Sequence, residues 1–294
     1  MPKAVAWRRD LHQNPELGNG EVRTAKVIAD HLRALGLEVK TGVAKTGVVG
    51  VLVGGRPGPV VALRSDMDAL PVTEEVDVPF ASKVRTQWAG RETGVMHACG
   101  HDMHMSILMA TAEVLAGMRA SLPGTMKFVF QPAEEGPPPG ERGGAAVMIE
   151  EGVLDSPKVS AIFGLHVFPY PVGTLVYKPE GIMAASDTVT IRVKGRQTHG
   201  AIPWAGVDPI VAASQVVLGL QTVVSRQSDI TAAPAIVTIG MIQGGNRSNI
   251  IPDEVTLTGT IRTFDPAMRT QILAGVKRTA EGIAQGSGAS AEVV

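Results

Sequence analysis

The spacing of apolar residues predicts alternating helices and strands over the first part of the chain. Apolar residues recur at intervals of three and four within residues 21–36, the pattern of an amphipathic helix that Gly36 would end. Further helices are expected near 102–118 and 144–151. Short apolar, β-rich runs predict strands at 47–53, 59–63, 125–130, 159–165 and 174–177. Strands that alternate with helices predict an α/β architecture.

The pattern changes after Gly181. Residues 187–194 alternate apolar and polar side chains, as a half-buried strand does. The elements expected from there are a strand, a helix, two strands, a helix and a final strand, at 187–194, 207–225, 235–240, 255–263, 266–285 and 291–294. That order is the split βαβ arrangement of ferredoxin-like domains. We therefore expect two domains, 1–180 and 181–294, with a boundary near 178–184.

Composition narrows the classes of partner. The chain has 294 residues and a formal net charge of −1, without the basic stripe that nucleic-acid binding requires. No apolar run approaches the roughly 20 residues of a membrane helix, and the N-terminus lacks the apolar core of a secretory signal. A single cysteine excludes an intrachain disulfide, which fits a reducing compartment. We expect a cytoplasmic protein that binds neither nucleic acid nor membrane.

Metal-binding residue types concentrate in one short stretch. Residues 96–104 read Met-His-Ala-Cys-Gly-His-Asp-Met-His and hold three of the seven histidines and the single cysteine. Soft and borderline ligands gathered in this way are typical of a transition-metal site. Alone, Cys99 would be read as an inert buried side chain, but beside three imidazoles we interpret it as a ligand. His97 and His104 are either ligands or residues that orient ligands.

Three further clusters follow predicted strands, where sites in open α/β sheets usually lie. Adjacent glutamates cannot point the same way, so one of Glu134 and Glu135 could bind a metal while the other faces the substrate; a solvated acidic loop is the alternative. Asp66 and Asp68 could hold ligands in place, or Asp68 could cap a turn. His166 ends the third strand. The remaining histidines, at 12, 31 and 199, would by themselves be structural or lie in a surface loop.

Other catalytic signatures are missing from the sequence. It contains no Gly-x-Ser-x-Gly nucleophile elbow, no phosphate-binding P-loop and no Gly-x-Gly-x-x-Gly after a strand. A zinc deaminase would need a Pro-Cys-x-x-Cys motif, which one cysteine cannot supply. These absences leave metal-assisted hydrolysis as the chemistry that the clusters favour.

Taken together, these segments resemble the M20 family of metallo-amidohydrolases, in the branch that contains hippurate hydrolase, N-acyl-amino-acid deacylases and plant auxin-conjugate hydrolases. The matching stretches are distributed along almost the whole chain and lie at 8–18, 63–71, 97–104, 131–136, 164–166, 194–200, 244–252 and 259–262. The resemblance implies a mixed-sheet, zinc-peptidase-like α/β catalytic domain with an inserted ferredoxin-like α+β domain that serves as a lid and in dimerisation. It also implies an N-acyl amino acid as substrate and a homodimer.

The resemblance assigns roles to individual residues. It implies two divalent metal ions (Mn, Zn, Co or Ni), with Cys99 as a bridging thiolate. Glu134 would be the general base, and Asp68 would orient a ligand. His199 would polarise the scissile carbonyl, often across a dimer interface in this family. It assigns three further metal ligands, His101, Glu135 and His166. It also assigns two substrate contacts, Asn249 and Arg262.

Two alternatives stay open at this point. One is a dipeptidase or aminopeptidase on the same scaffold. The other is a metal-binding remnant without turnover, because the family normally returns to its first domain after the small one and adds a last metal-binding histidine. Here the sequence ends at Val294 and no histidine follows His199. We therefore expect a C-terminally truncated chain or fragment, with the second metal site in question.

Overall fold

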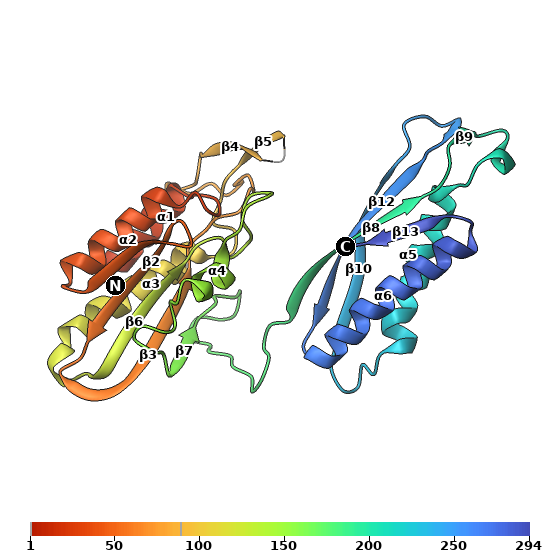
Figure 1. The fold of residues 1–294 in the computed structure, drawn as a ribbon. Helices are drawn as coiled ribbons and strands as arrows, with labels where there is room; N and C mark the ends of the chain where they lie inside the picture. The colour runs from red at the N-terminus through yellow and green to blue at the C-terminus, as the bar shows by residue number, and fades with distance from the viewer. Residues whose placement is uncertain (1, 89) are drawn as a thin grey trace. The chain divides into compact units, whose positions relative to one another are not determined.

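The computed structural model describes residues 2–88 and 90–294 (Figure 1). The chain divides into two units, Met1–Pro171 and Val172–Val294. Residues 165–184 contain neither helix nor strand, and the predicted boundary near 178–184 falls within this segment. None of the helices described is long and apolar enough to cross a membrane.

The first unit is an α/β layer structure. Its sheet has the strand order β1-β2-β6-β3-β7, in which β6, β3 and β7 are parallel and the other pairs are antiparallel. In chain order the elements are α1 (Pro2–Gln13), α2 (Val22–Ala34), β1 (Glu38–Val43), β2 (Gly47–Val53), β3 (Arg56–Asp66), β4 (Arg85–Trp88), β5 (Arg91–Gly94), α3 (His101–Gly117), the short 3-10 helix η1 (Arg119–Ser121), β6 (Pro123–Gln131), α4 (Gly144–Glu150) and β7 (Ala161–Gly164).

Alternating side chains of the central strands build a core on each face of this sheet. Phe128 and Phe130 of β6 are fully buried in a cluster with residues of α1, α2 and α3. Val129, between them, lies in a second cluster with Met148 of α4. The sheet is therefore covered on both faces, as parallel strands generally are. Figure 1 shows α1, α2 and α3 grouped together along the sheet.

The register of the parallel strands brings three chain segments to one edge. Asp66, the last residue of β3, is paired with Gln131, the last residue of β6. Arg64 of β3 is paired with Gly164, the last residue of β7. The loops that follow these strands therefore begin side by side at the carboxyl edge of the sheet.

The second unit has the predicted βαββαβ order. Its four main strands form an antiparallel sheet in the order β10-β12-β8-β13. Helices α5 and α6 pack together on this sheet around one apolar core (Figure 1). In chain order the elements are β8 (Ala185–Lys194), β9 (Thr198–His199), the 3-10 helix η2 (Pro203–Ala205), α5 (Pro209–Gln227), β10 (Ala235–Gly244), β11 (Ile250–Ile251), β12 (Glu254–Thr263), α6 (Pro266–Gly286) and β13 (Ser290–Val293).

The prediction of a strand at 174–177 is wrong. This segment contains no strand, and Leu175 and Tyr177 are 76% and 84% exposed. A β-rich composition yields a strand only where a neighbouring strand satisfies its backbone N–H and C=O groups. Within the described residues, none of the strand pairings includes this segment.

Candidate metal centre

The residues of the 96–104 cluster reach the carboxyl edge of the sheet through the start of α3. His101 is the first residue of this helix, and Cys99 lies two positions before it. Gly100, between them, has φ +82°, and a Cβ at this position would lie 2.5 Å from Cγ2 of Val167. Only glycine combines this backbone conformation with so close an approach. The turn thereby presents the thiol and the imidazole together.

Four of the predicted ligands lie in two overlapping donor groups. Cys99, His101 and His166 form one group, and His101, Glu134 and Glu135 form another, with the donor atoms of each group within 4.8 Å of one another. Sγ of Cys99 lies 3.3 Å from Nε2 of His166. Nε2 of His101 lies 3.8 Å from Oε1 of Glu135 and 3.7 Å from Oε2 of Glu134. His101 is thus common to both groups.

The hydrogen bonds of the two histidines suit metal binding. His101 donates its Nδ1 proton to the backbone oxygen of Asp68 at 2.7 Å, and His166 donates its Nδ1 proton to the backbone oxygen of Val167 at 2.7 Å. In the neutral imidazoles, Nε2 therefore carries a lone pair. Nε2 of His101 is buried and has no hydrogen-bond partner. Nε2 of His166 contacts only the thiol of Cys99, itself a candidate ligand, among the hydrogen bonds of the described residues. An imidazole oriented through one nitrogen, with the other turned toward the metal position, is the usual form of a metal ligand, so these residues fit a divalent cation.

His104 differs from these two ligands because both of its nitrogens are engaged. Nδ1 donates to Oδ1 of Asp66 at 2.6 Å, and Nε2 accepts the backbone N–H of Val167 at 2.9 Å. His104 and Asp66 do form a third donor group with His101. The bonding of His104 nevertheless favours an orienting role, the second of the two interpretations that the sequence left open.

His97 lies apart from the three donor groups found among the described residues. It is 4% exposed, and neither ring nitrogen has a hydrogen-bond partner. Burial lowers the pKa of His97 to about 4. A neutral imidazole packed in the interior is the role that these observations favour.

The two aspartates after β3 hold neighbouring groups. Oδ2 of Asp66 accepts from Arg64 at 2.7 Å. Burial by itself would raise the pKa of Asp66, but the hydrogen bond from His104 and the charges of His101 and Arg64 outweigh it and lower the pKa. Oδ2 of Asp68 accepts the backbone N–H of Glu135 at 2.9 Å. Asp68 thus contacts both His101, through its carbonyl, and Glu135, through its carboxylate.

The electrostatics of the edge disfavour added negative charge. Burial, followed by the charge of Asp66, raises the pKa of Glu134. Burial, followed by a hydrogen bond to Glu135, raises the pKa of the Cys99 thiol to about 12. A divalent cation would relieve this accumulation of anionic and lone-pair donors.

A buried network behind the donor groups was not predicted from the sequence. His12 faces Oδ2 of Asp102 at 2.8 Å through Nδ1 and Oε1 of Glu74 at 3.0 Å through Nε2. Arg8 also pairs with Asp102, at 2.8 Å. Because Asp102 directly follows His101, the network holds the start of α3. Residues 8 and 12 lie within the matching stretch 8–18, which was the one available signal.

In the second unit, two of the three predicted substrate residues lie together. His199 of β9 is paired with Ile250 of β11, and the backbone N–H of Gly200 donates to the carbonyl of Asn249 at 2.8 Å. Arg262 lies elsewhere in this unit, near the end of β12. It is paired with Ser186 at the start of β8, whereas Glu254 at the start of β12 is paired with Lys194.

Residues 62–290 match the model of peptidase family M20/M25/M40. The chain belongs to this family. Among its relatives, an N-acetylcysteine deacetylase of Bacillus subtilis is 44% identical over 292 residues, which are 99% of this chain and 73% of the relative. A thermostable carboxypeptidase 2 of Saccharolobus solfataricus is 41% identical, over 98% of this chain and 70% of the relative.

Solved structures of the M20 family have the same fold. A Bacillus subtilis protein described as a dinuclear metal binding peptidase of the M20 family superposes with a TM-score of 0.79, at 41% identity, over 100% of this chain and 72% of that one. The resemblance seen in the sequence and the α/β fold with a mixed sheet are therefore confirmed. As a member of the M20 family, the protein is a metal-dependent hydrolase of amide bonds.

Proposed function

We propose that this M20 protein cleaves the amide bond of N-acyl amino acids, with Glu134 as the general base. The observation that carries the proposal is the donor set at the sheet edge, in which Oε2 of Glu134 lies 3.7 Å from the free Nε2 of His101. The N-acetylcysteine deacetylase at 44% identity supports the substrate class.

Two divalent cations complete the proposed centre. Cys99, His101, Glu135 and His166 would hold them. Thiolate and imidazole suit zinc, and the carboxylate also admits manganese, cobalt or nickel. When bound, such ions lower the pKa of water toward neutrality and polarise a carbonyl.

The side chains then divide the proton transfers among them. The carboxylate of Glu134 accepts a proton from the attacking water and delivers it to the departing amine nitrogen. Its raised pKa suits a group that must both accept and return a proton. Nδ1 of His199 accepts the backbone N–H of Ala201 at 3.1 Å, so neutral His199 carries its proton on Nε2. That N–H is the donor that we assign to the developing oxyanion.

We further propose that the second unit is a lid and that the enzyme is a homodimer. Asn249 and Arg262 are the proposed substrate contacts, and the forked guanidinium of Arg262 suits a substrate carboxylate. Arg262 lies near one end of the β8–β12 pair, and at about 3.3 Å per residue the other end, where Lys194 pairs with Glu254, is roughly 26 Å away. His199 follows that other end, in β9. A small N-acyl amino acid cannot contact both within one protomer, which supports a contribution from a second copy. A cytoplasmic location completes the proposal.

A peptidase on the same scaffold is the second candidate. The carboxypeptidase relative, at 41% identity, favours it. The two candidates differ in the group on the carbonyl side of the scissile bond, a simple acyl group in one and an amino acid with a free amine in the other, so rates with hippurate and with simple dipeptides separate them. Faster hydrolysis of hippurate supports the amidohydrolase, and faster hydrolysis of dipeptides supports the peptidase.

Substitution of Glu134 tests the mechanism. We expect Glu134→Gln to bind as much metal as the wild type and to lose about 10²–10⁴-fold in kcat, since the amide cannot accept a proton. Glu150→Gln, at the exposed end of α4 after the same loop, is the matched control and should retain activity. Metal content is measured by elemental analysis alongside hydrolysis. Near-normal turnover of Glu134→Gln contradicts the assignment, and a wild-type protein that holds metal without turnover supports the remnant.

A further inference from the structure

Glu21 is a fully buried carboxylate to which the sequence assigned no role. It lies directly before α2 and is 0% exposed. Oε1 accepts the backbone N–H of Ala133 at 2.9 Å, and Oε2 accepts the hydroxyl of Thr46 at 2.5 Å. None of the ion pairs among the described residues involves Glu21. Burial of a carboxylate without a neighbouring cation costs free energy. The two groups that it accepts hydrogen bonds from therefore indicate what it does in this structure.

Ala133, whose N–H donates to Glu21, has an unusual backbone conformation. Ala133 has φ +47°, in the left-handed region, which costs a residue with a Cβ about 1–2 kcal/mol. The next residue is Glu134. The N–H that follows, of Glu135, donates to Oδ2 of Asp68 at 2.9 Å. Two buried carboxylates, Glu21 and Asp68, therefore hold the N–H groups on either side of Glu134.

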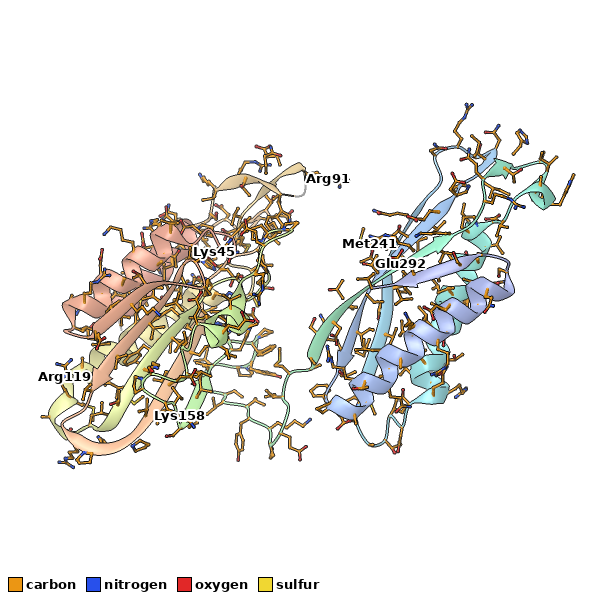
Figure 2. The ribbon with its side chains drawn as sticks, in the orientation of Figure 1. Lys45, Arg91, Arg119, Lys158, Met241 and Glu292 are labelled. Atoms are coloured by element: carbon orange, nitrogen blue, oxygen red, sulfur yellow. The ribbon has the colours of Figure 1, made fainter. Side chains whose placement is uncertain are left out.

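Other contacts fix the same loop to the chain segment that contains Glu21. A Cβ on Gly18 would lie 2.6 Å from the carbonyl oxygen of Gly136, so the two backbones are in direct contact. Nδ2 of Asn19 donates to Oε2 of Glu141 at 2.8 Å. Lys45, labelled in Figure 2, pairs with the same carboxylate at 2.5 Å. Residues 16–21, which we name the N-terminal clamp, thus lie along the loop that bears the two glutamates.

We propose that Glu21 is a positioning residue for the general base: it holds Ala133 in its left-handed conformation and so directs the carboxylate of Glu134 toward the donor set. The proposal rests on the proposed function, which makes Glu134 the base. Displacement of a catalytic group by about 1 Å can cost on the order of 100-fold in rate. A free loop would allow such a displacement, because the side chain of Glu134 is 38% exposed and its conformation depends on the backbone.

Three variants separate positioning from stability. Glu21→Met keeps the volume but removes both acceptors. Glu21→Gln keeps an acceptor for Ala133, and its amide can donate to the hydroxyl of Thr46. Thr46→Val, the matched control, removes the other hydrogen bond of the same carboxylate and leaves Ala133 held. Steady-state kinetics with an N-acyl amino acid, metal content and thermal unfolding are measured for each.

We expect Glu21→Met to lose about 10–100-fold in kcat and in kcat/KM alike, with KM within about twofold and normal metal content. The kcat of Glu21→Gln and of Thr46→Val should stay within about threefold of the wild-type value. Thr46→Val should nevertheless be less stable than the wild type, as Glu21→Met is. Normal turnover in Glu21→Met overturns the proposal. Equal losses in all three variants also overturn it, because they would follow stability rather than the hold on Ala133.

Two further measurements keep the test decisive. Glu134→Gln is assayed in parallel: turnover there removes the proposed function, whereas a loss there with normal Glu21→Met removes only the role of Glu21. If Glu21→Met does not fold, amide hydrogen exchange of Ala133 is followed in the wild type, Glu21→Gln and Thr46→Val. Protection in all three supports the proposal, and exchange of the wild-type amide at the rate of a free loop overturns it.

Discussion

The imidazole of His104 accepts the backbone N–H of Val167 at 2.9 Å and donates to Asp66 at 2.6 Å. Because Val167 directly follows His166, this chain of hydrogen bonds fixes the backbone from which a candidate ligand projects. The carbonyl of Val167 in turn accepts the Nδ1 proton of His166. Val167 is thus held on its N–H side while it orients the ligand through its carbonyl.

His104→Leu should weaken metal binding without removing a ligand. We expect the affinity for zinc to fall about 10–100-fold, as when other groups that orient ligands are lost, with unchanged stoichiometry. Competition with a chromophoric chelator measures the affinity. His31→Leu is the control. The ring of His31 hydrogen-bonds the carbonyl of Met109, which lies on α3 as His104 does but away from the donor groups. An affinity within about twofold of the wild type for His104→Leu would show that His104 does not orient the centre.

Gly100→Ala should disturb the centre more than the backbone strain alone would. The added Cβ would lie 2.5 Å from Cγ2 of Val167 at φ +82°, so either the turn that carries Cys99 and His101 or Val167, next to His166, must shift. Gly288→Ala is the control: its φ is +71°, but nothing lies within 4 Å of the added Cβ. Both variants should lose about 1 kcal/mol or more in free energy of unfolding. Only Gly100→Ala should lose metal affinity, measured by the same chelator competition, and equal affinities would refute this explanation.

Metal binding should release a proton from Cys99. Burial and Glu135 raise the pKa of this thiol to about 12, so without metal it is protonated at neutral pH. A bound thiolate must lose that proton, and the apparent affinity should therefore rise about tenfold per pH unit above pH 7.5. Cys99→Ser should bind more weakly, and its slope should be smaller by one proton. Calorimetry in buffers of different ionisation enthalpy counts the protons, and equal counts for both proteins would contradict the prediction.

The His12 network should make stability depend on pH. The hydrogen bond from His12 to Asp102 raises the pKa of His12, against the opposing effect of burial, and the bond to Glu74 raises it further. The folded pKa lies above the unfolded value near 6.5, so this stabilisation is complete below pH 6.5 and is lost as pH rises through the folded pKa. We expect His12→Gln to lower the free energy of unfolding by about 3 kcal/mol near pH 6, and by less near pH 10. Urea unfolding at both pH values tests this, and a loss independent of pH would be inconsistent with a charged pair.

The periodicity of apolar residues predicted the strongly amphipathic elements and missed those that depend on a neighbour. Helix α2 and the order of the second unit follow from which side chains must be buried. Helix α1 buries only Leu11 and His12, so it leaves almost no pattern to detect. Strand β1 is mostly exposed and exists through its pairing with β2. Residues 174–177 have a strand-like composition but no neighbouring strand to pair with, so they form no strand.

The candidate site was predictable as far as sequence proximity and strand ends reach. Clustering pointed to Cys99 and His101, and the rule that sites follow strand ends pointed to Glu134 and His166. Whether an imidazole binds metal or orients a ligand depends on what both nitrogens contact, which sequence does not specify; His104 is the example. The contact between Glu21 and Ala133 joins residues 112 positions apart, and no local pattern marks it.

All of the donor groups found among the described residues lie within Met1–Pro171, and the three residues assigned to the substrate lie within Val172–Val294. If the proposed roles of these residues hold, metal binding and substrate choice are encoded by separate modules. Exchange of the second module between relatives, by natural recombination or in the laboratory, would redirect the enzyme to other amides while its reactive chemistry stays constant.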